Sequence, residues 1–488
     1  MKVRIVLFED QQLCRMRPLS WSVPVWDLPV GMYSLRERME ILTGDAGGIL
    51  LARPALAQLI DGDPWRTEWK MTAPDGHDLW LSGRLGARWE VLQGLLDAAG
   101  SGREFVWLYK GCPVAANLGR ETSSAVHESW RTWLVSCRDG MWRGRHLLDP
   151  WDIEDLFSGW ESGRRSGDHQ LLVNPRGDHG DGADPTGRWR SWPDMAYSTL
   201  DAVWDLVPAT EPAITEDIER TAELERGRFP LGISARSGDP LWERATNLSP
   251  LGGTLPGGVW ILGDPQQVFL GPRVSLEPGT VIDTSRGPVI LDHGVQVQAS
   301  CRLEGPLYLG RGCRVKSGAR LYGGCAFGIG CRVAGEIGET VAMHFVNKQH
   351  DGFIGHAVLG SWINLGAMTT CSDLKNNYGP VRVDLGWGPL ETGSRFVGLL
   401  AAEHVKTAIG TLLNTGTCIG FASNIFGAGM PPKHVPCFAW GGQDAGAGHD
   451  VERALATAAV VMDRRGCRLL GGHETLFRLI ASGSGQSP

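Results

Sequence analysis

Apolar side chains in the second half of the chain recur with a period of six residues. A period of six matches neither an α-helix nor a simple strand. It is typical of a coil in which each flat face takes one hexapeptide, so that three hexapeptides form a triangular turn and stacked turns share one core. The unbroken series comprises Leu291, Val297, Leu303, Leu309, Val315, Leu321, Phe327 and Val333. The same spacing appears earlier at Leu270, Leu276 and Ile282, and later at Phe353, Leu359 and Leu365.

The fourth position after each member of this series is again small or apolar. This register predicts that four cysteines point into the core, where a thiol behaves as a small hydrophobic group rather than as a nucleophile. The positions are Val295, Cys301, Leu307, Cys313, Ala319, Cys325, Cys331 and Ile337.

Two polar segments interrupt the period, and functional loops of a solenoid are expected at such breaks. The first runs from Val341 to Gly352 and the second from Cys371 to Pro380. Hexapeptides resume between them, so the sequence predicts that both loops leave the coil close together and share one cleft. His350 beside Asp351 is the candidate general base, because imidazole titrates near neutral pH. The alternative is an ordinary surface histidine.

The first half of the chain has the pattern of an α/β domain. Residues 3–8 and 105–109 are expected to be strands, and residues 88–98 a helix. A second helix is expected from Ser34 to Leu42, since Ser34 and Glu37 have the spacing of a capping box.

These patterns divide the chain into four regions. We expect an α/β domain over 1–207 with a flexible insertion near 161–190, and a connection over 208–256 with one helix from Thr215 to Glu225. A β-helix follows over 257–442. Residues 443–488 are expected to form one helix, from Val451 to Arg464, and a disordered tail from Ser482 to Gln486.

Composition excludes several classes of protein. The 47 Lys and Arg against 54 Asp and Glu give a net charge of −7, which argues against nucleic acid as a partner. No apolar run reaches the roughly 18 residues of a membrane span, and the start does not resemble a signal peptide. Eleven cysteines without a CxxC pair indicate neither a disulfide framework nor a zinc site. We therefore expect a cytoplasmic protein.

The hexapeptide pattern resembles the left-handed parallel β-helix of the bacterial acyltransferases. The segment Lys348 to His356, followed by Ile363 to Ala367, is similar to the acetyltransferase half of a bifunctional enzyme that joins N-acetylglucosamine-1-phosphate uridylyltransferase and glucosamine-1-phosphate acetyltransferase. His350, Phe353 and Asn364 fall on its motif in register. The resemblance implies that His350 is the base, that Asn364 contacts the sugar, and that the active site lies between the chains of a homotrimer.

The resemblance also supplies the remaining substrate and cosubstrate residues. An acceptor that is a sugar phosphate or nucleotide sugar would be bound by Asn347, Lys348, Phe353, Asn364, Lys375, Asn376, Asn377 and Tyr378. Acetyl-CoA or a related acyl-CoA would be bound by Arg395, Lys406 and Thr407. The chain departs from the motif at Gly338, Phe353 and His356, where the family has lysine, tyrosine and aspartate, so the sequence leaves the acceptor open.

A less-studied branch of this family, whose members are classed as sugar nucleotidyltransferases or as alternative bifunctional enzymes, is similar over most of the chain. Sugar nucleotidyltransferases hold a triphosphate with a glycine-rich loop and cations after the first strand. Here Glu9-Asp10-Gln11-Gln12 stands in its place. The candidate nucleotidyl-site residues are Asp10, which would bind Mg²⁺, and Arg15, Arg17, Arg36 and Arg38. The alternative is the solvated face of a degenerate domain.

Three functions therefore remain open from the sequence. The first is acyl transfer with His350 as general base. The second is nucleotidyl transfer in the first domain, alone or as an additional activity. The third is a non-catalytic trimer that binds sugar nucleotides or serves as a scaffold.

Overall fold

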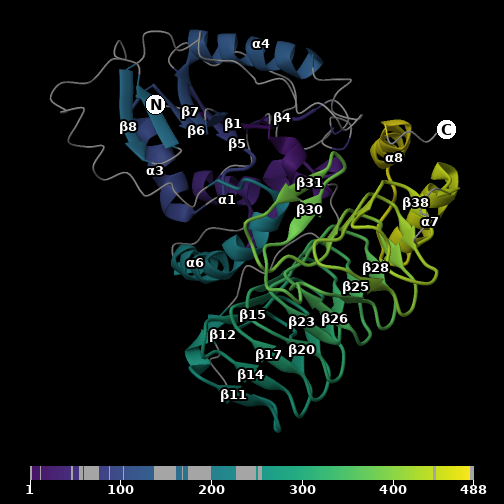
Figure 1. Ribbon diagram of the computed structural model, residues 1–488. Coiled ribbons are helices and arrows are strands. Elements are labelled where there is room, and N and C mark those ends of the chain that lie inside the picture. The colour runs from purple at the N-terminus through teal and green to yellow at the C-terminus, as the bar shows by residue number, and fades with distance from the viewer. Residues whose placement is uncertain are drawn as a thin grey trace. The chain divides into compact units, whose positions relative to one another are not determined.

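The computed structural model describes residues 3–10, 12–44, 48–53, 56, 59, 76–86, 88–102, 104–110, 112–136, 161–166, 169–173, 199–226, 249–250, 255–442 and 447–483. The chain forms two compact units (Figure 1). The first comprises Met1–Cys14, Pro24–Leu28 and Ser34–Asp201, and the second comprises Arg15–Val23, Pro29–Tyr33 and Ala202–Pro488. The units therefore interleave in sequence, unlike the continuous 1–207 domain that we expected.

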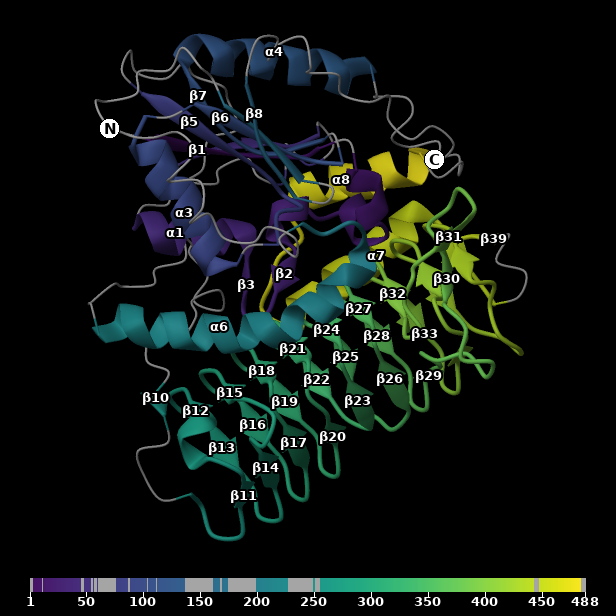
Figure 2. The ribbon, with the colours of Figure 1, turned by 60° about the vertical axis from the view of Figure 1, so that its left-hand side comes forward.

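The first unit is an α/β domain built on a mixed sheet of seven strands, in the order β4-β1-β5-β7-β6-β9-β8. The pairs β4–β1 and β1–β5 are parallel and the other pairs are antiparallel. Helix α4 lies on one face of the sheet and α1 and α3 lie on the other (Figure 2). The strands are β1 (Val3–Phe8), β4 (Gly48–Leu51), β5 (His77–Ser82), β6 (Phe105–Tyr109), β7 (Cys112–Gly119), β8 (Glu161–Ser166) and β9 (His169–Val173). The helices are α1 (Leu35–Thr43), α3 (Trp89–Gly100) and α4 (Arg120–Ser136).

The local sequence signals in this unit are confirmed. Strands β1 and β6 and helices α1 and α3 form where they were expected, to within two residues. The Ser34 hydroxyl accepts a hydrogen bond from the Glu37 amide and the Glu37 carboxylate accepts one from the Ser34 amide, which completes the capping box of α1.

The prediction of a flexible insertion near 161–190 is wrong at its start. Strands β8 and β9 pair with each other, and β9 also pairs with β6. Residues 161–166 carry little strand propensity, so their conformation comes from this pairing rather than from local sequence. The remainder of the segment, 174–190, lies outside the described residues.

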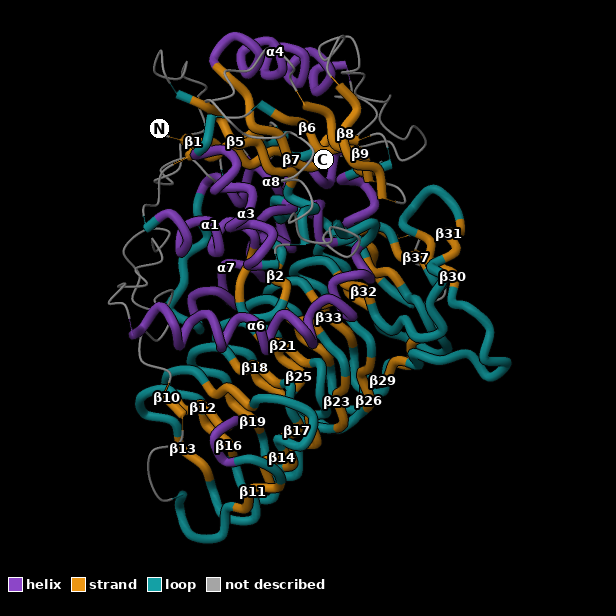
Figure 3. Tube along the Cα trace, turned by 90° about the vertical axis from the view of Figure 1, so that its left-hand side faces the viewer, coloured by secondary structure: helices purple, strands orange, loops and turns teal. Residues whose placement is uncertain are grey.

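The second unit contains a parallel β-solenoid with three faces, which the chain visits in a fixed order (Figure 3). The first face comprises β12 (Val268–Leu270), β15 (Val289–Leu291), β18 (Leu307–Leu309), β21 (Cys325–Phe327), β24 (Val341–Ala342), β27 (Val358–Leu359), β32 (Leu400–Ala401), β35 (Cys418–Ile419) and β37 (His434–Val435). The second comprises β13 (Ser275–Leu276), β16 (Gln296–Val297), β19 (Arg314–Val315), β22 (Arg332–Val333), β25 (Asn347–Lys348), β28 (Asn364–Leu365), β33 (Lys406–Thr407), β36 (Asn424–Ile425) and β38 (Ala439–Trp440). The third comprises β11 (Trp260–Leu262), β14 (Val281–Asp283), β17 (Arg302–Glu304), β20 (Arg320–Leu321), β23 (Glu336–Gly338), β26 (Phe353–Gly355), β29 (Thr370–Cys371) and β34 (Leu412–Leu413). Two short strands pair antiparallel at the ends, β10 (Ser249–Pro250) with β12 and β39 (Ala447–Gly448) with β38.

The period-six register is confirmed by the core of this coil. The whole series from Leu291 to Val333 is at most 1% exposed, and members one turn apart, such as Val297 and Val315, stack in register on parallel strands. The four predicted inward cysteines are buried as well, and burial raises the pKa of the Cys325 thiol to about 12. These thiols are therefore packing groups.

The first predicted interruption, Val341 to Gly352, is wrong. Strands β24 and β25 keep this segment in the coil, and Lys348 takes the inward position that Val333 takes one turn earlier. The period of six lapses because the turn shortens from 18 to 16 and 15 residues and a lysine occupies a core position, not because the chain leaves the coil. The register also shifts by one residue on β26, where Ile354 is inward and Phe353 is outward.

The second interruption is confirmed and is longer than expected. Between β29 and β32 the chain makes an excursion over residues 372–399, whose antiparallel hairpin comprises β30 (Arg382–Asp384) and β31 (Pro389–Glu391). The coil resumes in register after it, since Leu359 on β27 pairs with Ala401 on β32.

Helices cover parts of the solenoid. Helix α6 (Leu206–Arg226), which includes the helix expected over 215–225 but begins nine residues earlier, lies along the first face at β18, β21 and β24 (Figure 2). Helix α7 (Val451–Asp463) agrees with its prediction, whereas α8 (Gly471–Gly483) was not anticipated. The expected disordered tail begins inside α8, and residues 484–488 lie outside the described part of the chain. None of the described helices is long and apolar enough to cross a lipid bilayer.

Two segments from near the start of the chain pack within the second unit. The Arg17 guanidinium lies 4.0 Å from the Trp21 ring centre and 5.2 Å from that of Trp387 in the excursion. The Met32 amide donates a 2.7 Å hydrogen bond to the Asp217 carboxylate on α6. These contacts explain why short N-terminal segments belong to the solenoid unit.

Candidate functional site

His350 lies at the corner where the coil passes from the second face to the third, between β25 and β26. Its side chain is exposed, and its ring forms no hydrogen bond or ion pair within the described part of the chain. The ring nitrogens are therefore open to a ligand. This is the arrangement that a general base requires before its substrate arrives.

Lys348 shapes this corner from inside the coil. Its side chain is 1% exposed, and Nζ donates hydrogen bonds to the carbonyl oxygens of His350 and Asp351, the latter at 3.0 Å. Burial lowers the pKa of the Lys348 amine to about 8, with Asp351 acting in the opposite direction. The sequence predicted that Lys348 binds the substrate. In the structure its side chain instead points into the coil and holds the backbone that carries His350.

Asn347 and Asn364 lie next to this corner on the outer surface of the second face. They are register partners on β25 and β28, and Asn347 Nδ2 donates a 2.6 Å hydrogen bond to Asn364 Oδ1. Asn347 Oδ1 is buried and accepts no hydrogen bond from the described residues. Asn347 precedes His350 by three residues and Asn364 is its partner on the next turn, so the pair presents amide groups beside this corner, where a polar substrate would meet them.

The predicted substrate loop lies at a different corner. The excursion leaves the coil where the third face meets the first, so β26 separates its corner from that of His350. At about 3.3 Å per residue this three-residue strand spans about 10 Å. The third face therefore separates the corner of His350 from the corner at which the excursion leaves the coil, and Phe353, half-buried on β26, lies between the two corners.

Within the excursion, a tight turn displays polar and aromatic groups. Asn376, Asn377 and Tyr378 are exposed, with Tyr378 at 68%. The turn is closed by a hydrogen bond from Lys375 Nζ to the Pro380 carbonyl at 2.9 Å and one from the Gly379 amide to Asn377 Oδ1 at 3.1 Å. Lys375 is thus engaged locally, and Tyr378 is the group most available to a partner.

An ion-pair cluster of Glu339, His356 and Asp373, here called the clamp, joins the excursion to the coil and was not expected from the sequence. His356 Nδ1 lies 2.8 Å from Asp373 Oδ2, its Nε2 contacts Glu339 Oε2, and its ring stacks on Phe396 with 4.8 Å between ring centres. Burial opposes charging of the imidazole, but the two carboxylates prevail and raise its pKa to about 9. The hydrogen bond to His356 in turn lowers the pKa of Glu339. Because both nitrogens are engaged, His356 is a charged clamp and not a second base.

The spacing of the clamp is the signal that sequence reasoning missed. Glu339, His356 and Asp373 are 17 residues apart, which is the length of a turn in this part of the coil. Residues one turn apart lie above one another, so an acidic-basic-acidic series at that spacing indicates a stacked ion pair.

The three residues expected to bind an acyl-CoA are not brought together. Arg395 is exposed in the excursion. Lys406 is outward on β33, where Nζ donates to the His404 carbonyl at 3.0 Å and burial lowers its pKa to about 8. Thr407 is wrong as a ligand group, because it points into the coil and its hydroxyl accepts a hydrogen bond from the Gly366 amide.

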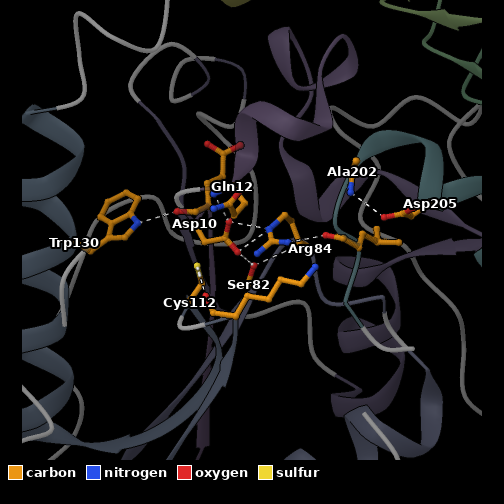
Figure 4. A network of polar contacts seen from close by, with 11 residues as sticks. Asp10, Gln12, Ser82, Arg84, Cys112, Trp130, Ala202 and Asp205 are labelled. Atoms are coloured by element: carbon orange, nitrogen blue, oxygen red, sulfur yellow. Dashed lines mark hydrogen bonds and ion pairs between the residues drawn. The ribbon is translucent and has the colours of Figure 1, made fainter. Parts of the chain in front are cut away.

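In the first unit, the carboxylate of Asp10 is engaged by protein groups (Figure 4). It accepts hydrogen bonds from Arg84 Nε at 2.9 Å, from Ser82 Oγ at 2.6 Å and from the Gln12 amide at 2.9 Å, and Asp10 is 1% exposed. Arg84 Nη1 also donates to the Leu200 carbonyl. This arrangement leaves Asp10 no open face for the Mg²⁺ that the sequence assigned to it.

The four arginines expected to hold phosphates are dispersed. Arg36 pairs with Asp27 at 2.8 Å, and Arg38 is buried with its guanidinium 5.6 Å from the Trp89 ring centre. Arg15 and Arg17 belong to the second unit. Within the first unit, Arg36 and Arg38 are thus engaged by protein groups.

No group of three or more His, Cys, Asp or Glu side chains in the described part of the chain is arranged to hold a metal ion. The chain matches no protein-family model and no curated protein sequence.

Proposed function

We propose that the protein is an acyltransferase that moves an acyl group from a CoA thioester to a sugar phosphate or nucleotide sugar. The observation that carries this proposal is the exposed His350 ring at a solenoid corner, beside the Asn347–Asn364 amide pair. In the proposal the solenoid is left-handed, as in the acyltransferases that the sequence resembles.

The reaction needs one base and no covalent enzyme intermediate. His350 takes a proton from an amine or hydroxyl of the acceptor, which attacks the thioester carbonyl. Backbone N–H groups stabilise the oxyanion of the tetrahedral intermediate. The intermediate then expels the CoA thiolate, which receives the proton from His350.

The proposal includes a homotrimer, because the excursion and His350 lie at different corners of one chain. In a trimer the excursion of one copy reaches the His350 corner of its neighbour and supplies Asn377 and Tyr378. Two features support such packing. The first is Tyr378, whose side chain is 68% exposed. The second is the pair Met368 and Ile409, which come shortly after the second-face strands β28 and β33 and are 54% and 80% exposed. Exposed apolar groups of this size are typical of interaction surfaces.

The test is CoA release from acetyl-CoA with a panel of amino-sugar phosphates and nucleotide-linked amino sugars. We expect turnover with at least one acceptor and a loss of about 10²–10⁴-fold in kcat for His350→Ala. His293→Ala is the matched control, since His293 lies about three turns away and contacts Arg273. No CoA release with any acceptor, or full activity of His350→Ala, would refute the proposal.

A mixing experiment tests the site between chains. His350→Ala and Tyr378→Ala are each expected to be inactive, and trimers reassembled from both should recover part of the activity at sites that combine two intact surfaces. If the mixture stays inactive while wild type reassembled in the same way is active, the site lies within one chain.

The same preparation also tests nucleotidyl transfer. Because Asp10 is paired with Arg84, we expect no pyrophosphate release from nucleoside triphosphate, sugar-1-phosphate and Mg²⁺.

A further inference from the structure

Two arginines stand side by side on the outer surface of the second face. Arg314 on β19 and Arg332 on β22 are register partners, so their Cα atoms are separated by one strand spacing of about 4.8 Å. Their neighbours Val315 and Val333 point inward and are fully buried, which directs both guanidinium groups outward. Like charges at this distance destabilise a sheet unless something compensates them.

The end of helix α7 brings two more arginines to the same place. Arg465 Nη1 donates a 3.1 Å hydrogen bond to the carbonyl of Gly330, two residues before Arg332, and its guanidinium lies 5.9 Å from the Phe345 ring centre. Arg464 is exposed beside it. This helix end is fixed by an apolar cluster comprising Ile329, Phe345, Trp362, Met462 and Cys467.

No carboxylate among the described residues forms an ion pair with any of these four arginines. Two arginines on the third face differ: Arg302 pairs with Asp283 at 2.8 Å, and Arg320 pairs with Glu336 at 3.1 Å. Arg332 Nε is buried and has no hydrogen-bond partner within the described part of the chain. Burial and the neighbouring arginines lower the pKa of both Arg332 and Arg465.

The dipole of α7 compensates only part of the positive charge of these four arginines. Cations are stabilised at a helix C-terminus, which explains Arg464 and Arg465. It does not explain Arg314 and Arg332, which lie on strands. An anion is the missing component.

We propose that the arginine cluster, Arg314, Arg332, Arg464 and Arg465, binds the diphosphate of a nucleotide-type ligand. Guanidinium groups hold phosphate oxygens in bidentate pairs, and four of them match two adjacent phosphates better than one. Arg332 is the register partner of Asn347, so a ligand anchored here extends along the second face toward His350. The inference deepens the proposed function and rests on it for the choice of ligand.

Two ligands of that function carry a diphosphate, CoA and a nucleoside-diphosphate sugar. Calorimetric titration of the full chain with CoA, with UDP-N-acetylglucosamine and with orthophosphate distinguishes them. We expect one of the two nucleotides to bind much more tightly than orthophosphate, with an affinity that falls steeply as salt is raised. The nucleotide that binds identifies the substrate anchored by the cluster.

The variant Arg332→Gln/Arg465→Gln should weaken that binding by about 10²- to 10⁴-fold, since two charged hydrogen-bond donors are lost. Arg382→Gln, which removes an exposed arginine paired with Glu391, is the control and should bind as wild type does. Equal binding by the double variant, or binding no tighter than that of orthophosphate, would overturn the inference. Nucleotide binding that survives while no acyl transfer is found would refute the proposed function and leave the arginine site standing.

Discussion

The clamp of His356 between Glu339 and Asp373 should make the stability of the protein depend on pH in a specific window. The perturbation is His356→Gln, which keeps the approximate size of the side chain and removes its charge. A rise in pKa from 6.5 to about 9 corresponds to about 3 kcal/mol, at 1.36 kcal/mol per pKa unit. The lowered pKa of Glu339 is the same interaction seen from the carboxylate and adds nothing to this figure.

The sign follows from proton linkage. Below pH 6.5 the imidazole is charged in both the folded and the unfolded chain, so the full stabilisation is present. Between pH 6.5 and 9 the unfolded chain loses the proton while the folded chain keeps it, and the stabilisation declines. Above pH 9 it is gone. The clamp is thus strongest in mild acid, where the Glu339 carboxylate, whose pKa His356 lowers, is still ionised.

The assay is urea unfolding of wild type and His356→Gln at pH 6.0 and at pH 9.5. The variant should be less stable by about 3 kcal/mol at pH 6.0 and nearly equal to wild type at pH 9.5. Carbon-13 NMR of labelled histidines should give one imidazole, absent from the variant, that titrates near pH 9. His350→Gln is the control for stability, because that ring has no partner among the described residues. A stability difference that is the same at both pH values would refute the reasoning.

Three further predictions concern buried groups. Leu309 is a fully buried inward residue, so Leu309→Ala should lower the free energy of unfolding in urea by about 2–5 kcal/mol. Tyr378 is exposed, so the unfolding free energy of Tyr378→Ala should lie within about 0.5 kcal/mol of that of wild type. Equal effects of the two substitutions would contradict the inward register. Arg84→Met should destabilise the first unit by about 3–5 kcal/mol, because it leaves the Asp10 carboxylate buried without its cation, and an unchanged tryptophan-fluorescence transition would speak against this pairing. Wild type should gain up to about 3 kcal/mol of stability as pH rises from 8 to 10.5, where the buried Lys348 amine no longer has to be charged. Lys348→Met should lack the part of this stability gain that comes from the Lys348 amine. If the unfolding free energies of wild type and variant change with pH in parallel, the prediction is wrong.

The fold of the solenoid could be predicted from sequence because its signal is repeated. Each inward residue from Leu291 to Val333 is independent evidence for the same register, and one exception does not erase the rest. The signal fails where one core position is polar. In the sequence, a lysine at position 348 resembles a loop residue. In the structure it lies in the core, where its Nζ donates hydrogen bonds to two backbone carbonyl groups.

The candidate site was only partly predictable, because it depends on which corner each residue reaches. His350 was identified by its residue type and neighbours, and the structure leaves it exposed. The excursion that carries Tyr378 leaves from another corner. That placement follows from the number of residues per turn, which changes from 18 to 15 and then to 17 along the coil and cannot be read from an apolar pattern that has lapsed. The clamp and the arginine cluster join residues that are distant in sequence, so neither forms a local motif.

In the first unit, local signals were sufficient for single elements and insufficient for the sheet. The capping box at Ser34 and Glu37 fixes the start of α1 without help from the rest of the chain. Strand β8 has no such signal, since Glu161–Ser166 is polar and becomes a strand only by pairing with β9.

The docking of Arg17 against Trp387, and of Met32 against Asp217, has a consequence for how the chain can be made and divided. On the ribosome, Arg17 emerges long before Trp387 is synthesised, so its segment cannot contact Trp387 until nearly four-fifths of the protein exists. The last steps of assembly are therefore expected to join the N-terminal segment to the excursion. A fragment beginning at Ala202 would lack both segments, and exchange of the first unit between related proteins would have to carry them along. The protein thus has two structural units, but no single cut in the sequence separates them.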